Sequence, residues 1–149
     1  MDLQSLIDRA EITDLLTRYA RAVDRQDWDL FRTVFTPDAR IDYTQVGGMA
    51  GDLDTVVGFL AEVMATFEAV QHLVSNIDIT IDGDEAKVTA MVYNPLKLPD
   101  TPVWATGGWY HHKLVRTPDG WRSRSLVEEA GWFHGVPEPA RPTGGDPAA

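Results

Sequence analysis

The sequence contains no cysteine. This absence excludes a disulfide framework, a thiolate metal site and a cysteine nucleophile. Positive charge is also scarce, because 13 basic residues stand against 23 acidic ones and the formal net charge is −10. A chain with this charge is repelled by phosphate backbones and by anionic lipid headgroups. We therefore expect no nucleic-acid partner and no membrane partner.

Long apolar runs are missing as well. No run approaches the ~18 residues that a membrane-spanning helix needs, and residues 1–8 lack the basic-then-apolar pattern of a signal peptide. We therefore expect a cytoplasmic protein. The 149 residues, 44% of them hydrophobic, suffice for one domain with a substantial core. We place this domain at residues 1–135, and expect residues 136–149, rich in Pro and Gly, to form a disordered or extended tail.

Apolar residues at three- and four-residue spacings predict a long amphipathic helix over residues 3–23. A shorter helix is predicted over residues 27–35, with Asp24 or Asp27 as its N-cap, and a third within residues 53–67. Strict alternation and turn residues predict strands near 40–44, 71–81, 87–93, 103–116 and 121–129. Helices gathered on one face of an antiparallel sheet indicate an α+β fold.

The predicted strands bring several polar side chains to one face. Alternation places Tyr43 inside, sets His72 on a face with Asn76, and groups Tyr110 with His112 rather than His111. A hollow lined by apolar residues and a few polar groups is typical of a small-molecule site.

Each candidate has an alternative interpretation. Asp24 is either a helix cap or an active-site acid, and His72 is either a satisfied structural histidine or a proton-transfer group. A metal site formed by His72, His112 and a carboxylate has less support, because no helical histidine spacing accompanies it. We predict no metal and no cofactor.

A set of short motifs extends from about residue 5 to about residue 133. They are Ala10-Glu11-Ile12, Leu15-Leu16, Tyr19-Ala20-Arg21-Ala22, Asp24, Asp27-Trp28, Leu30-Phe31, Phe35-Thr36-Pro37-Asp38-Ala39, Gln71-His72, Asn76, Gly107-Gly108, Tyr110 and Asp119-Gly120-Trp121-Arg122. With them the sequence resembles the SnoaL-like branch of the superfamily that includes nuclear transport factor 2 (NTF2), scytalone dehydratase, ketosteroid isomerase and limonene epoxide hydrolase. The resemblance implies a cone-shaped, curved antiparallel sheet wrapped around three N-terminal helices. This NTF2-like, cystatin-like α+β barrel is usually dimeric through its outer sheet face.

Scytalone dehydratase is similar around Asp24, Tyr43 and His72. The resemblance implies that Asp24 orients a histidine, that His72 moves a proton, and that Tyr43 polarises a carbonyl or holds a water. The remaining predicted substrate-binding residues are Tyr19, Trp28, Asn76, Tyr110 and His112. The sequence departs from the dehydratase at Val23, where that family has a tyrosine. No residue is assigned to the acid that polyketide cyclases hold deep in the pocket.

These observations favour a cofactor-independent lyase or isomerase, with dehydratase- or cyclase-like acid–base chemistry. Its substrate would be a hydrophobic, oxygenated small molecule such as a polyketide, steroid or terpenoid, and its protein partner a second copy of the chain. Two alternatives stay open. One is a non-catalytic NTF2-like module that binds a small molecule or docks a partner; the other is a small subunit supporting a ring-hydroxylating dioxygenase.

Overall fold

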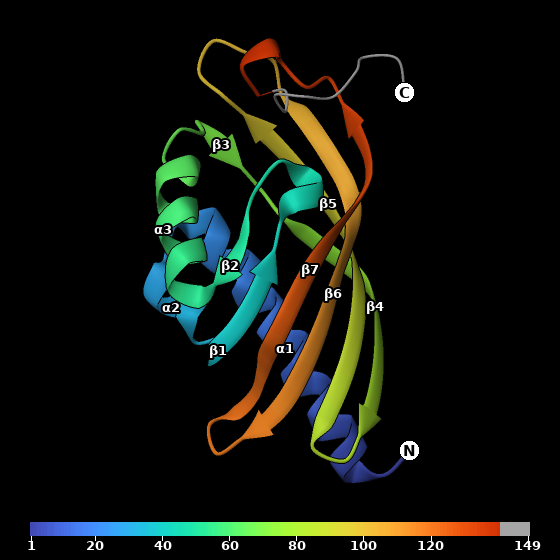
Figure 1. Ribbon diagram of the computed structural model, residues 1–149. Helices are drawn as coiled ribbons and strands as arrows, with labels where there is room; N and C mark the ends of the chain where they lie inside the picture. Colours follow the sequence, from blue (N-terminus) through green and yellow to red (C-terminus); the bar gives the residue numbers. More distant parts are fainter. Residues whose placement is uncertain (141–149) are drawn as a thin grey trace.

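The structure, a computed structural model, describes residues 1–140 (Figure 1). Its longest helix, α1 (Leu3–Arg25), begins where the Asp2 carboxylate accepts a hydrogen bond from the Ser5 backbone N–H. The helix ends at Gln26, whose φ of 53° is left-handed and terminates the helical hydrogen bonding. Its buried face carries the apolar residues that the sequence periodicity placed there, from Ile12 to Val23.

Two shorter helices follow, and each is capped by an aspartate. The Asp27 carboxylate accepts the Leu30 N–H at the start of α2 (Trp28–Arg32), and Asp52 accepts the Thr55 N–H at the start of α3 (Leu53–Met64). Helix α2 is shorter than predicted because the chain already enters a strand at Phe35. The cap of α2 is therefore Asp27, and Asp24 is left for another role.

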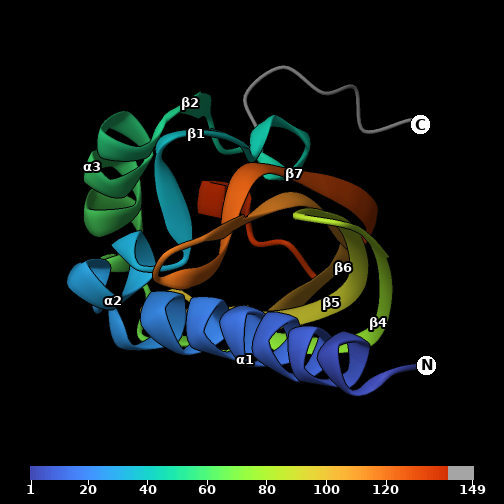
Figure 2. The same ribbon diagram turned by 90° about the horizontal axis from the view of Figure 1, so that it is seen from below.

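The strands form one strongly curled, seven-stranded sheet (Figure 2). They are β1 (Phe35–Asp42), β2 (Ala50–Asp52), β3 (Ala69–Val70), β4 (Leu73–Asp82), β5 (Glu85–Lys97), β6 (Trp104–Thr117) and β7 (Gly120–His134). Short 3-10 turns lie at η1 (Thr44–Val46) and η2 (Glu138–Ala140). The order is β2-β1-β7-β6-β5-β3, and β4 pairs with β5 beside β3. Seen in Figure 2, the sheet curves from β4 round to β1, and α1 lies across its open side.

The predicted fold class, an NTF2-like α+β cone, is confirmed, with differences in the strands. The sheet is mixed, because β1 runs parallel to β7 while the other pairs are antiparallel. Strand β5 continues through Pro95 to Lys97, beyond the end of the strand predicted at residues 87–93. Strand β4 carries a register shift between Ser75 and Asp78, and Asn76 there has a φ of 50°.

Register across β5, β6 and β7 decides which side chains face the helices. One row joins Ala90, Tyr110 and Glu128, and the next joins Val88, His112 and Leu126. All six side chains are buried between the concave face of the sheet and the helices. The intervening residues, among them His111 and Glu129, point to the outer face.

Of the predicted tail at 136–149, only residues 136–140 are described, and the rest lies outside the described residues. Within residues 1–140, no helix combines the length and the apolar character that crossing a membrane requires.

Candidate active site

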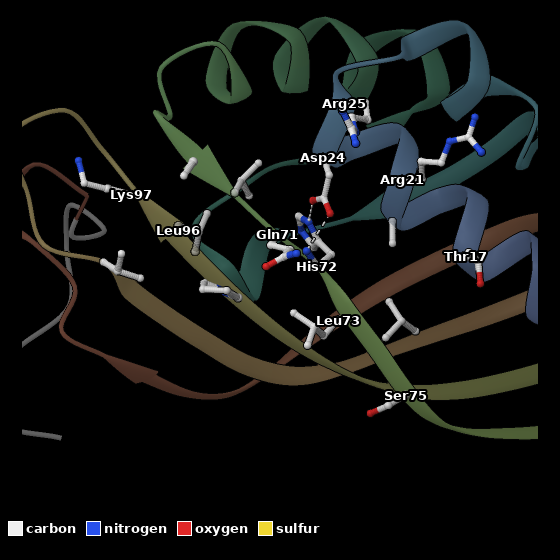
Figure 3. Close-up of a pocket in the computed structure, with 16 residues that line it drawn as sticks. Thr17, Arg21, Asp24, Arg25, Gln71, His72, Leu73, Ser75, Leu96 and Lys97 are labelled. Atoms are coloured by element: carbon white, nitrogen blue, oxygen red, sulfur yellow. Dashed lines mark hydrogen bonds and ion pairs between the residues drawn. The ribbon is translucent and has the colours of Figure 1, made fainter.

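Asp24, in the last turn of α1, and His72, immediately before β4, are joined by two hydrogen bonds (Figure 3). The His72 backbone N–H donates to Asp24 Oδ2 at 3.0 Å, and Nδ1 of the imidazole lies 2.6 Å from Oδ1. Because an ionised carboxylate only accepts hydrogen bonds, Nδ1 carries the proton in this pair. In the neutral imidazole, Nε2 then holds the lone pair that can take up a proton.

His72 stands between two hollows. One is an interior cavity of about 130 Å³ that is partly open to solvent and lies between α1, α3 and the concave face of the sheet. The other is an outer groove of about 970 Å³, which Asp24 also lines and which Arg21, Arg25 and Lys97 border (Figure 3). The His72 side chain is only 7% exposed and that of Asp24 20% exposed. The pair is therefore largely shielded from water, which strengthens its electrostatic interaction.

Three phenols line the interior cavity. The hydroxyl groups of Tyr19 and Tyr43 share a hydrogen bond of 2.7 Å, and the ring of Tyr110 stands edge-on to Tyr19 with the centroids 5.2 Å apart. Burial raises the pKa of each of these phenols well above its ordinary value of 10. All three are therefore neutral hydrogen-bonding groups at physiological pH.

The backbone around Tyr43 fixes that phenol in place. The Tyr43 N–H donates to the Met49 carbonyl, and the Gly48 N–H donates to the Tyr43 carbonyl, both at 2.9 Å. A Cβ atom at Gly48 would lie 2.7 Å from the Cβ of Tyr43, so only glycine fits at this crossing. The glycine-rich segment at residues 47–51 is thus hydrogen-bonded against Tyr43 and lines the cavity at Gly47 and Gly48.

Glu128 on β7 is an acid in the cavity wall that the sequence analysis did not single out. It is 7% exposed, and burial raises its pKa from 4.5 to about 7. Within residues 1–140 no side-chain hydrogen bond or ion pair involves its carboxyl group. Alternation along β7 contained the signal, because the apolar Leu126 shares its face with Glu128.

Asn94 and Thr106, opposite each other on β5 and β6, also line the cavity and were missed. The reason is that the sequence placed the end of the second strand at Tyr93, one residue before Asn94.

Three predicted substrate-binding residues lie elsewhere. Trp28 packs edge-on against Phe31 with the ring centroids 5.9 Å apart, and it lines neither hollow. Asn76 is exposed, because the register shift in β4 turns it away from the interior.

His112 is buried and does not line the cavity, and its Nδ1 bonds to the hydroxyl group of Ser123 at 2.9 Å. Burial lowers the pKa of this imidazole to about 3. His112 therefore does not meet His72 in a shared site.

A curled sheet that encloses a partly polar cavity, with an Asp–His pair at the edge, defines an NTF2-like protein. A sequence profile of the SnoaL-like domain matches residues 4–127, which is most of the chain. The chain therefore belongs to the SnoaL-like family.

The chain is also similar to individual proteins along most of its length. The uncharacterized protein Rv2910c of Mycobacterium tuberculosis is 36% identical over 130 residues, covering 86% of this chain and 88% of that protein. The crystal structure of the Kfla4162 protein from Kribbella flavida is 34% identical and superposes with a TM-score of 0.81, covering 87% of this chain and 95% of that one. Hexachlorocyclohexane dehydrochlorinase LinA-type3 from Novosphingobium barchaimii shares the fold, with a TM-score of 0.80 at 17% identity over 93% of this chain and 96% of that one.

Proposed function

We propose that the protein is a cofactor-independent lyase or isomerase whose proton-transfer group is His72. The observation that carries this proposal is the two-point attachment of His72 to Asp24 at the wall of a cavity that also contains three neutral phenols. A carboxylate that fixes the imidazole tautomer leaves Nε2 as a base and stabilises the imidazolium that forms. This is the constellation that abstraction of a proton next to a carbonyl requires.

In the proposed mechanism, His72 Nε2 removes a proton from the carbon adjacent to a substrate carbonyl. Tyr43, held by its backbone hydrogen bonds, donates a hydrogen bond to the carbonyl oxygen as negative charge develops there. The hydroxyl group of Tyr19 shares a hydrogen bond with the hydroxyl group of Tyr43 and so orients it. Asp24 keeps the imidazole in place and balances its charge during the step. The resulting enolate either reprotonates elsewhere, giving isomerisation, or expels a leaving group.

The cavity narrows the class of substrate. Its volume of about 130 Å³ is close to that of an engineered cavity of ~150 Å³ that holds benzene, so it favours a single ring among hydrophobic, oxygenated molecules. Among residues 1–140, no Lys or Arg lines it, whereas Glu128 does. An uncharged substrate therefore suits the cavity better than an anion. The name of LinA-type3, a dehydrochlorinase of a six-membered ring compound, supports elimination chemistry on this fold.

The test is exchange of the α-protons of cyclohexanone in D₂O, followed by NMR. We expect His72→Asn to lower the enzyme-dependent exchange rate at least ~100-fold, because a positioned general base contributes about that much. His111→Asn is the matched control, because His111 lies on the outer face and bonds to Glu129. Unchanged exchange in His72→Asn would contradict the proposal. Saturable cyclohexanone binding without exchange in the wild-type protein would instead favour a non-catalytic binding module.

We further propose that the protein forms a homodimer through the outer face of its sheet. Leu73, Tyr93 and Trp132 lie in one row across this face, each 47–48% exposed, and Met91 lies in the next row. The Trp132 ring covers Gly107, where a Cβ would lie 2.2 Å from the indole, and stands 5.9 Å from the Tyr93 ring. Contiguous exposed apolar side chains of this kind favour association with a second copy.

A further inference from the structure

We propose that Glu128 is the proton donor to the leaving group, and that the group this protein eliminates is therefore a hydroxyl, released as water. This inference rests on the proposed function of His72 and adds to it the identity of the acid and of the leaving group.

The position of Glu128 makes it available to a ligand. Its cross-strand neighbour is Tyr110 on β6, and both side chains line the cavity. Within the described residues no side chain hydrogen-bonds the carboxyl group, although Glu128 is a buried residue. Polar groups in protein interiors almost always have a hydrogen-bond partner, either protein or water, and the carboxyl group of Glu128 faces the cavity. A substrate hydroxyl in the cavity supplies the missing partner.

The surroundings of Glu128 favour the protonated form of its carboxyl group. The titratable groups that face it are the phenols of Tyr19 from α1, Tyr43 beyond β1 and Tyr110 from β6, with the imidazole of His72 across the cavity. In the part of the chain that the structure describes, none of the cavity residues is a Lys or Arg that would favour the carboxylate. With its pKa raised to about 7, a large share of the carboxyl groups carries a proton at neutral pH.

Among the cavity groups, this carboxyl is the one suited to protonate a departing oxygen. Burial raises the phenol pKa values well above 10, so the phenols donate hydrogen bonds but give up a proton reluctantly. A general acid is most effective when its pKa lies near the working pH. Glu128 meets that condition, and His72, oriented by Asp24, is the complementary base.

The two groups also come from different parts of the wall. His72 immediately precedes β4, whereas Glu128 lies on β7, and strands β5 and β6 separate the two in the curled sheet. A substrate between them presents its acidic C–H to one group and its C–O bond to the other. This arrangement suits the removal of hydrogen and hydroxyl from neighbouring carbons of one ring.

The step is balanced without any further reactant. His72 Nε2 takes the proton from the α-carbon, and the C–H electron pair becomes the new carbon–carbon π bond. The C–O bond to the β-carbon breaks, its electrons pass to oxygen, and the Glu128 proton joins that oxygen to give water. The imidazolium and the carboxylate that remain return to their starting states when a proton passes from one to the other through water. The products are an unsaturated ketone and water.

The need for an acid depends on the leaving group. Chloride and acetate depart as stable anions, whereas hydroxide is a strong base and leaves readily only when protonated. A buried, protonated carboxyl group has no use in the loss of chloride. The presence of Glu128 in the cavity therefore indicates dehydration.

The experiment compares three single-ring probes in wild-type protein and Glu128→Gln. We expect the variant to eliminate water from 3-hydroxycyclohexanone at least ~100-fold more slowly, as expected for loss of a general acid. Elimination of acetate from 3-acetoxycyclohexanone is expected to fall less than about tenfold, and α-proton exchange in cyclohexanone less than about threefold. Glu128→Asp keeps the acid and is expected to restore part of the lost dehydration rate. Glu129→Gln, on the outer face, is the matched control.

Several outcomes would contradict the role of Glu128 or that of His72. An equal fall for all three probes in Glu128→Gln, or an unchanged dehydration rate, would overturn the role of Glu128. Wild-type protein that exchanges α-protons but does not release water from the hydroxyketone would also overturn it, while leaving the function of His72 intact. If His72→Asn loses α-proton exchange while Glu128→Gln keeps it, the base role of His72 is supported independently of the acid role of Glu128. Absence of both exchange and elimination in wild-type protein would overturn the proposed function, and this inference with it.

Discussion

Asp24 and Asp27 are the same residue type three positions apart, yet the structure gives them different partners. The carboxylate of Asp27 accepts a hydrogen bond from the backbone N–H of Leu30, three residues further along the chain, a contact that local geometry alone creates. The carboxylate of Asp24 meets His72, 48 residues away, through two hydrogen bonds. Local sequence permits either aspartate to cap the helix. Only the packing of α1 against the start of β4 decides between them.

The buried carboxyl group of Glu128 should make stability depend on pH. Its pKa in the folded state is about 7, above the ordinary 4.5, so between these values the folded protein binds more protons than the unfolded chain. Stability from this group is therefore complete below pH 4.5 and is lost as the pH rises through 7. The loss should amount to about 3 kcal/mol, because each pKa unit corresponds to ~1.4 kcal/mol.

Urea unfolding of wild-type protein and Glu128→Gln at several pH values measures this effect. The difference in unfolding free energy between the two proteins should shift in favour of Glu128→Gln as the pH rises from 4.5 to 7.5, and level off above that. The partly exposed neighbour in Glu129→Gln is the control. Parallel pH profiles for the wild type and Glu128→Gln would show that the carboxyl group is not buried in the way the structure indicates.

At the scale of elements, helix α1 depends on a polar clamp near its N-terminal end. The buried Asp8 carboxylate accepts two hydrogen bonds from Arg116 of β6, at 2.6 and 2.9 Å, and one from the indole N–H of Trp121 at 3.1 Å. The Arg116 guanidinium lies 4.5 Å from the centroid of the Trp121 ring and also bonds Asp84. This clamp sets the position of α1 along the sheet, and therefore the position of Asp24 relative to His72.

Asp8→Asn should destabilise the protein by about 2 kcal/mol at pH 7. The substitution breaks a charge-assisted ion pair with Arg116 in which the Asp8 side chain is buried. The Arg116 hydrogen bonds hold the pKa of Asp8 well below its ordinary 3.8. The stabilisation is therefore present above pH 3.8 and is lost as the pH falls through lower values. The difference between wild type and variant should accordingly shrink in strongly acidic solution.

Chemical denaturation of the wild-type protein and Asp8→Asn at pH 7 and pH 3 measures this difference in unfolding free energy. Asp84→Asn is the matched control, because Asp84 bonds the same guanidinium but has a side chain that is 83% exposed. Its effect should stay within about 0.5 kcal/mol, as for an exposed ion pair. Equal effects of the two substitutions would mean that burial does not distinguish the two carboxylates.

For the whole molecule, the proposed dimer gives a direct prediction. Light scattering after size exclusion should report twice the chain mass of 16.6 kDa. Tyr93→Glu places a charge in the middle of the apolar row and should shift the protein to monomers, because an unpaired charge is costly in an apolar interface. Thr13→Glu, on the exposed face of α1, is the control and should stay dimeric. A monomeric wild type, or a Tyr93→Glu variant that dimerises as tightly, would contradict the proposal.

The sequence by itself determined the amphipathic helices, most of the strands and the fold class. These depend on local periodicity, because residues three or four apart on a helix, or two apart on a strand, must share a face. The interior positions of Tyr19, Tyr43 and Tyr110 follow from the same rule. The family motifs also lie along the chain and are legible without tertiary structure.

Other features were decided only by the tertiary structure, because they depend on contacts between segments that are distant in the sequence. The register shift in β4 exposes Asn76, and the continuation of β5 past Pro95 brings Asn94 into the cavity wall. The parallel pairing of β1 with β7 has no local signature, because strand order follows from how the whole sheet curls. Glu128 is the clearest case. Its alternation with Leu126 is visible in the sequence, but the raised pKa of its carboxyl group arises only once the helices cover the cavity and remove water from it.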